Sequence, residues 1–160
     1  MRLLVCAVGH RMPAWVSAGF EEYARRMPRK APIELIEIRA QPRPARAPGA
    51  AEVERILEAE ARRIRAALPD RCRTVALDEH GKTLATVELA RLLQDWMHEG
   101  GDTGFVIGGA DGLQPALKRD ASLTLSLSRM TLPHQLVRVL LAEQLYRSIS
   151  LLHGHPYHRE

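Results

Sequence analysis

Long apolar runs are missing from this chain of 160 residues. The longest run, Leu3 to Val8, is far shorter than the about 20 residues that a membrane-spanning helix needs. His10 and Arg11 follow it without a small-residue cleavage site, so it is not typical of a secretory signal. We therefore expect a cytoplasmic protein without a membrane anchor.

Cysteine is scarce as well, because the chain has only Cys6 and Cys72. Two cysteines cannot supply the disulfide framework of a small secreted scaffold, and we expect both thiols to be reduced and packed. A chain of this length buries roughly 70% of the surface that its unfolded form exposes, so its core needs neither disulfides nor a structural metal.

The net charge of +4 is unevenly distributed. Residues 1–50 hold nine Lys or Arg against four Asp or Glu, whereas the rest of the chain is nearly balanced. Such asymmetry is typical of a protein with a polyanionic partner, but a charge run is more often a solvated face, and charge alone favours that second interpretation.

Apolar runs that suit strands alternate with segments of helical periodicity. The expected strands cover residues 3–8, 33–38, 74–77, 105–107 and 123–127, and the expected helices cover 13–23, 53–68, 89–97, 115–119 and 133–152. This alternation predicts an α/β fold with a mainly parallel sheet flanked by helices. Neither a repeat nor a linker interrupts it, so we expect one domain over residues 1–160.

The last expected helix, residues 133–152, carries more apolar residues than one stripe can hold. It needs burial on two sides. A central helix in one core and a helix that also contacts a second subunit satisfy this need equally well.

Ligands of open α/β sheets bind beyond the carboxyl ends of the strands. Three such ends are notable here: Leu77-Asp78, the glycine-rich Gly108 to Gly112, and Leu127 to Leu132. Together they predict an adenosine-sized pocket, in which a flat ligand lies on bare backbone at Gly108. A valine at Gly108 should then block the ligand and leave the fold intact.

The segment Gly81-Lys82-Thr83 invites comparison with a phosphate-binding loop. A Walker loop needs a glycine five positions before Gly81, and Ala76 stands there inside an expected strand. We therefore expect Lys82 and Thr83 to form a turn and a helix entry, which disfavours a phosphate-loop nucleotidase.

The chain ends in His153 to Glu160, rich in histidine, tyrosine and arginine. The spacing of its three histidines matches no recognised metal site, and we expect no bound metal. The remaining alternatives are a disordered basic end and a segment that stacks on unpaired bases and pairs with phosphate.

Several motifs resemble the ribosomal RNA large subunit methyltransferase H family of the SPOUT superfamily. They span the chain: Ala7 to Val16, Gly19 to Tyr23, Glu34 to Ile38, Ile107 to Gly109, Thr131 to Arg138, and His155 to Glu160. The segment Arg39 to Ala50 and the positions Ala110, Asp111 and Gln114 depart from the usual family pattern.

The resemblance implies an S-adenosylmethionine-dependent homodimer with a C-terminal trefoil knot. Its activity would be methylation of N3 of a pseudouridine in 23S ribosomal RNA, as free RNA or within the ribosome. It places the methyl donor against Leu77, Gly108, Leu127, Ser128, Arg129, Met130, Thr131 and Leu132. These residues belong to the three strand ends described above.

Methylation at N3 requires loss of an imide proton. We expect His158 to act as the base, Arg159 to stabilise the anion, and Tyr157 to seat the target base. Glu143 and Arg147, one turn apart, are interpreted as a surface pair.

For RNA binding we expect His155 and three loop arginines, Arg39, Arg43 and Arg46, to take part. No acidic residue lies between these arginines in sequence, so we expect them to be free to contact phosphates. A non-catalytic RNA-binding module is the alternative function, and binding of S-adenosylmethionine distinguishes the two.

Overall fold

Residues 1–157, which the computed structural model describes, contain five strands and five helices. The strands β1 (Leu3–Val8), β2 (Ile33–Ile38), β3 (Arg73–Thr83), β4 (Thr103–Ile107) and β5 (Leu123–Ser126) pair in parallel in the order β2-β1-β4-β3-β5. The helices are α1 (Ala14–Ala24), α2 (Ala50–Ala67), α3 (Thr86–Glu99), α4 (Pro115–Asp120) and α5 (His134–Leu152). The predicted α/β fold with a parallel sheet is confirmed.

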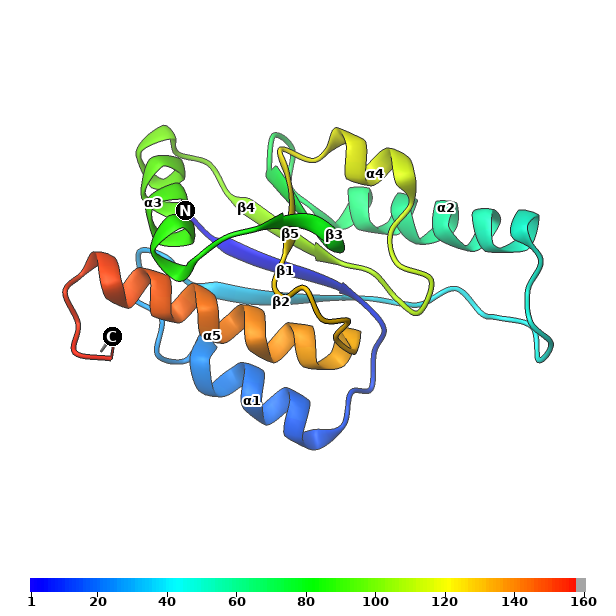
Figure 1. The fold of residues 1–160 in the computed structure, drawn as a ribbon, viewed down its shortest axis with the longest axis horizontal. Coiled ribbons are helices and arrows are strands. Elements are labelled where there is room, and N and C mark those ends of the chain that lie inside the picture. Colours follow the sequence, from blue (N-terminus) through cyan, green and yellow to red (C-terminus); the bar gives the residue numbers. More distant parts are fainter. Residues whose placement is uncertain (158–160) are drawn as a thin grey trace.

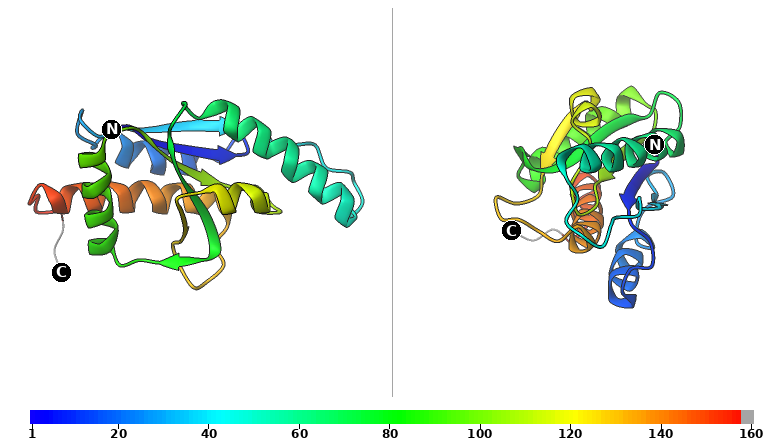
Figure 2. Two further views of the ribbon diagram at one scale, coloured as in Figure 1. Left: turned by 90° about the horizontal axis from the view of Figure 1, so that it is seen from above. Right: turned by 90° about the vertical axis from the view of Figure 1, so that its right-hand side faces the viewer.

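Helices cover both faces of the sheet (Figure 1). On one face, Phe20 of α1, Leu93 of α3 and Leu145 of α5 share a core with alternate strand residues. On the other, Ile64 of α2 and Leu117 of α4 pack in a second core. Figure 2 shows the sheet between these two helical layers. A sheet covered on both sides explains why β1 is a continuous apolar run.

Both cysteines are free thiols, as the sequence predicts. Cys6 lies in β1 with no exposed surface, and burial raises its pKa to about 12. Cys72 is half-buried just before β3.

Strand β3 is longer than the sequence predicts. Its pairing with β5 shifts between Leu77 and Lys82, and the strand then continues to Thr83. A Cβ atom on Gly81 would lie 2.8 Å from backbone atoms of β5, so this second pairing requires glycine there. The expected turn and helix entry at Lys82 and Thr83 is therefore wrong, because both residues pair with β5.

Helix α5 packs between the sheet, α1 and α3. Leu141, Leu145 and Ile149 are buried in the core, whereas Leu136 and Leu140 stay half-buried. The two-sided burial inferred from the sequence is thus partly met within one chain. No helix in the described part of the chain is long and apolar enough to cross a membrane.

Candidate functional site at the carboxyl ends of β3, β4 and β5

The three predicted strand ends converge on one cavity. Its volume is about 240 Å³ and its apolar floor includes Ile107 and Leu125. The walls include most of the predicted cofactor residues: Leu77, Gly108, Leu127, Ser128, Met130, Thr131 and Leu132. Arg129 is exposed and does not line the cavity. That the predicted cofactor residues contact a bound ligand stays a prediction.

A tight turn after β4 forms one wall of the cavity. The amide of Gly112 donates a hydrogen bond of 3.1 Å to the carbonyl oxygen of Gly109, and Gly112 has a φ of +77°. A Cβ atom on Gly108 would lie 2.4 Å from the backbone of Gly112. The expectation that Gly108→Val leaves the fold intact is therefore wrong, because the turn itself excludes a side chain there.

Asp78 follows the first half of β3 and supplies a carboxylate to the cavity. The Nζ atom of Lys118 donates to its Oδ2 at 2.8 Å, and the amide of His80 donates to its Oδ1 at 2.9 Å. Burial acts to raise the pKa of Asp78, but these hydrogen bonds outweigh it and the pKa is lowered. Asp78 is therefore an ionised acceptor at neutral pH.

The loop after β5 is fixed by its own hydroxyl groups. Ser126 donates to the carbonyl oxygen of Ser128 at 2.7 Å, and the Ser128 hydroxyl accepts from the amide of Met130 at 2.9 Å. Thr131 donates to Glu79 at 2.7 Å and so ties this loop to the one after β3. The loop is thereby held against the cavity before any ligand enters.

His134, the first residue of α5, lines the same cavity. Burial and the positive charges of Arg138 and Arg43 lower its pKa. Its imidazole is therefore neutral at pH 7 and able to accept a proton. With the apolar floor and the Asp78 carboxylate, the donors and acceptors present suit a nucleoside.

Sequence reasoning placed Asp78 at one of the three strand ends without giving it a role, and it did not select His134 for the site. Asp78 had a usable signal, because it directly follows a predicted strand. His134 had none in periodicity or spacing, since only tertiary packing brings the start of α5 beside the strand ends.

Of the predicted tail residues, the described ones, His155 and Tyr157, do not line this cavity. Tyr157 follows the C-terminal end of α5, whereas His134 at the other end of the helix lines the cavity, and the ring centroid of Tyr157 lies 4.7 Å from that of Tyr146. Helix α5 has 19 residues and so spans about 28 Å, at about 1.5 Å per residue. His155 is exposed near Tyr157. The predicted catalytic residues His158 and Arg159 lie outside the described residues.

Glu143 and Arg147 do more than form the expected surface pair. The Arg147 guanidinium lies 4.9 Å from the centre of the Tyr157 ring, and the Tyr157 hydroxyl donates to Glu143 at 3.3 Å. Burial, with the neighbouring Tyr23 and Glu143, raises the pKa of Tyr157 to about 12. Tyr157 therefore remains a protonated hydrogen-bond donor at neutral pH.

The three predicted RNA-binding arginines differ in their surroundings. Arg39 is exposed, with its carbonyl oxygen bound by Arg63. Arg46 is 70% exposed and lies 3.0 Å from Glu52. The side chain of Arg43 is 27% exposed and bonded to Asp111. The expectation that all three are free of carboxylates is wrong, because folding brings acidic residues from other segments to Arg43 and Arg46.

Comparisons with known proteins are consistent in the family they indicate. A family model described as "Predicted SPOUT methyltransferase" matches residues 1–158. Ribosomal RNA large subunit methyltransferase H of Nitrosospira multiformis is 58% identical over 159 residues, 99% of each chain. The protein of the same name from Ralstonia pickettii is 56% identical over 99% of each chain.

Among solved structures, the SpoU methyltransferase AviRb from Streptomyces viridochromogenes, in complex with AdoMet, is 16% identical, with a TM-score of 0.46. The match covers 91% of this chain and 57% of that one. The family model and the full-length relatives decide the assignment: this chain belongs to the SPOUT methyltransferase family.

Proposed function

We propose that this protein uses S-adenosylmethionine to methylate N3 of a pseudouridine in 23S ribosomal RNA. The observation that carries the proposal is 58% identity over 99% of both chains with a protein named ribosomal RNA large subunit methyltransferase H. The cavity at the ends of β3, β4 and β5 supports it, because its lining suits a nucleoside.

The residues present fit the proposed cofactor. Apolar lining residues such as Leu77 and Ile107 suit an adenine ring, and hydroxyls of the ribose can donate to the Asp78 carboxylate. When bound, S-adenosylmethionine supplies an electrophilic methyl group on a positively charged sulfur. The preformed loop after β5 orients the ligand, so positioning supplies much of the rate enhancement.

Methylation at N3 needs one group that can accept a proton and another that can donate a hydrogen bond to the target base. The target N3 carries a proton that must leave before or during transfer. His134 lines the cavity and is neutral at pH 7, so its imidazole can accept that proton. Tyr157 stays protonated and can hydrogen-bond a carbonyl oxygen of the target base. His158 keeps the proposed role of base, with His134 as the alternative acceptor of this proton, and Arg159 keeps the role of anion-stabilising cation.

The position of the tail favours a homodimer. Because α5 separates Tyr157 from the cavity of its own chain, a second copy can bring its tail to that cavity. Trp15 is 56% exposed, and Leu136, Val139 and Leu140 are half-buried along the adjacent α5. The Cβ position of Gly19 lies 3.1 Å from Val139, so α1 and α5 present one continuous face for such a copy.

Three further expectations belong to the same proposal. Residues 1–160 act as one SPOUT domain, and the C-terminal part carries the trefoil knot that the resemblance implies. An enzyme that modifies ribosomal RNA works where ribosomes are, which places it in the cytoplasm. Its substrate is ribosomal RNA or an assembled subunit, and it needs no metal.

Two measurements test the proposed function. Calorimetry should show binding of S-adenosylmethionine and of its demethylated product to the purified chain. Ribosomal subunits that lack the modification should then accept a labelled methyl group, which mass spectrometry locates on pseudouridine. RNA binding without cofactor binding would instead support the non-catalytic RNA-binding module.

A further inference from the structure

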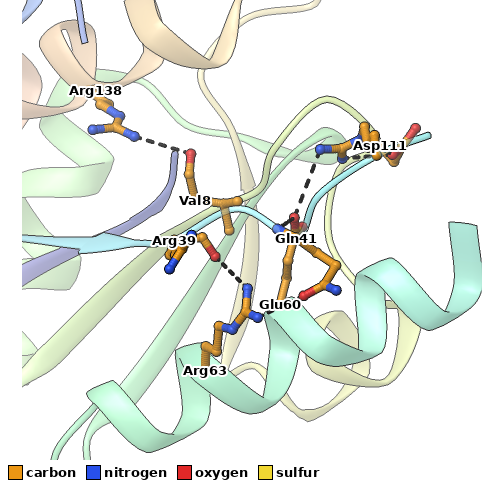
Figure 3. A network of polar contacts seen from close by, with 8 residues as sticks. Val8, Arg39, Gln41, Glu60, Arg63, Asp111 and Arg138 are labelled. Atoms are coloured by element: carbon orange, nitrogen blue, oxygen red, sulfur yellow. Dashed lines mark hydrogen bonds and ion pairs between the residues drawn. The ribbon is translucent and has the colours of Figure 1, made fainter. Parts of the chain in front are cut away.

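A chain of polar contacts joins the segment after β2 to the turn after β4 (Figure 3). The segment, residues 39–43, carries Arg39 and Arg43. The turn, residues 109–112, forms one wall of the cavity. These two stretches are far apart in sequence. Helix α2 makes hydrogen bonds to the segment, and Arg43 of the segment makes hydrogen bonds to Asp111 of the turn.

Arg43 makes the direct contact with the turn. Its Nε and Nη2 atoms donate to Oδ2 of Asp111 at 2.9 and 2.7 Å. Nη2 also lies 3.7 Å from the position that a Cβ atom would take on Gly109. The guanidinium is thus packed against the turn and does not itself line the cavity. Hydrogen bonds between charged groups are short and strong, so this contact can hold the turn in place.

Helix α2 fixes the segment from the other side. Glu60 is 2% exposed, accepts from the amide of Gln41 at 2.9 Å, and has an oxygen 4.0 Å from Arg43. Arg63 donates to the carbonyl oxygen of Arg39 and to the side chain of Gln41, both at 2.7 Å. With its backbone held at two points, the segment presents Arg43 to Asp111 in one geometry.

The charge of Arg43 also reaches the cavity. After burial and the charge of Arg138, it is a cause of the lowered pKa of His134, which also lines the cavity. Loss of Arg43 therefore affects both the turn and a titratable group of the site.

We propose that Arg43 is a positioning residue of the cofactor cavity, acting through Asp111 on the turn 109–112, and is not a phosphate ligand for RNA. The inference rests on the proposed function. It separates Arg43 from Arg39 and Arg46, which share its loop but have no contact with the turn in the described structure.

Arg43→Gln removes the positive charge of the guanidinium. Asp111→Asn removes the negative charge of the carboxylate and keeps the shape of the turn. Each should weaken binding of S-adenosylhomocysteine about tenfold. The KM for S-adenosylmethionine should rise with little change in kcat, and the salt dependence of RNA binding should stay that of the wild type. The double variant should lose no more affinity than either single variant, because both remove the same contact. Arg43→Lys should recover part of the affinity.

Arg65→Gln is the matched control, because Arg65 pairs with the exposed Asp120 on the surface, 3.5 Å away. It should bind S-adenosylhomocysteine like the wild type. Hydrogen exchange of the amides in the turn, measured without any ligand, should accelerate in Arg43→Gln and not in Arg65→Gln. If Arg43→Gln does not fold, the same affinity and hydrogen-exchange measurements on Asp111→Asn test the inference.

Wild-type affinity in both Arg43→Gln and Asp111→Asn would overturn the inference, as would a reduced salt slope for RNA in Arg43→Gln. Failure of the proposed function gives a different result. The wild-type chain would then bind no S-adenosylhomocysteine, while exchange in the turn would still report whether Arg43 holds it.

Discussion

The buried guanidinium of Arg138 donates a hydrogen bond of 2.8 Å to the carbonyl oxygen of Gly9. The same group donates to the carbonyl oxygen of Val8 at 3.1 Å (Figure 3) and to Glu37 at 3.0 Å. It thereby ties the first turns of α5 to the ends of β1 and β2. This contact fixes where α5, and with it His134, begins beside the sheet.

Arg138→Ala should lower the free energy of unfolding by about 3 kcal/mol, since it leaves buried carbonyl oxygens and Glu37 without their donor. Urea unfolding followed by circular dichroism measures this change. Arg65→Ala, which removes a surface pair, should have little effect. Equal stability of the two variants would contradict the role assigned to Arg138.

Gly108→Ala should destabilise the protein and reduce cofactor affinity together. The added Cβ atom would meet the Gly112 backbone at 2.4 Å, so the turn must move. Thermal unfolding and calorimetry report the two effects. Gly49→Ala is the control, because a Cβ atom there meets nothing within 4 Å. Full stability of Gly108→Ala would show that the turn tolerates a side chain.

The Asp78 carboxylate should stabilise the fold at neutral pH and not in acid. Its folded pKa is lowered because hydrogen bonds, led by that of Lys118, outweigh the effect of burial. The stabilisation is therefore present above the ordinary aspartate pKa of about 4 and is lost as the pH falls through the lowered value. The urea midpoints of wild type and Asp78→Asn should differ at pH 7 and converge as the pH falls through the lowered pKa of Asp78. Asp70→Asn, at an exposed position, should differ less at pH 7.

Arg39 and Arg46 should supply RNA affinity through phosphate contacts. Arg46 pairs with Glu52, but this pair is exposed, so phosphate can replace the carboxylate at little cost. Replacing both arginines by glutamine should reduce the slope of log affinity against log salt by about one unit for each phosphate that is no longer neutralised. Cofactor affinity should not change. An unaltered slope would exclude these arginines from the RNA interface.

Two variants with complementary defects should regain activity when mixed. A chain lacking residues 157–160 keeps its cavity, and Gly108→Ala keeps its tail. If the tail serves the partner's cavity, a mixed dimer has one complete site, and an equal mixture recovers up to about one quarter of wild-type activity. If the tail served its own cavity, the mixture would remain inactive. The tail-deleted chain alone should still bind S-adenosylmethionine.

The order of strands and helices was predictable because it depends on local patterns. The apolar run Leu3 to Val8 could be recognised as a buried strand, and α3 ends at Glu99, two residues beyond the expected end at residue 97, where Gly100 takes a φ of +79°. The strand ends that form the cavity followed from the same patterns, because parallel strands bring their carboxyl ends to one edge.

The partners of charged side chains were not predictable in this way. Arg43 meets Asp111 across 68 residues of sequence, and Arg138 meets Gly9 across 129. Sequence spacing describes neighbours within one helix or strand, whereas these contacts depend on how separate elements pack. Local sequence therefore determined which segments form strands and helices and which strand ends form the cavity. Tertiary structure decided that Arg43 supports the cavity, that Gly108 serves the turn, and that Tyr157 lies at the far end of α5.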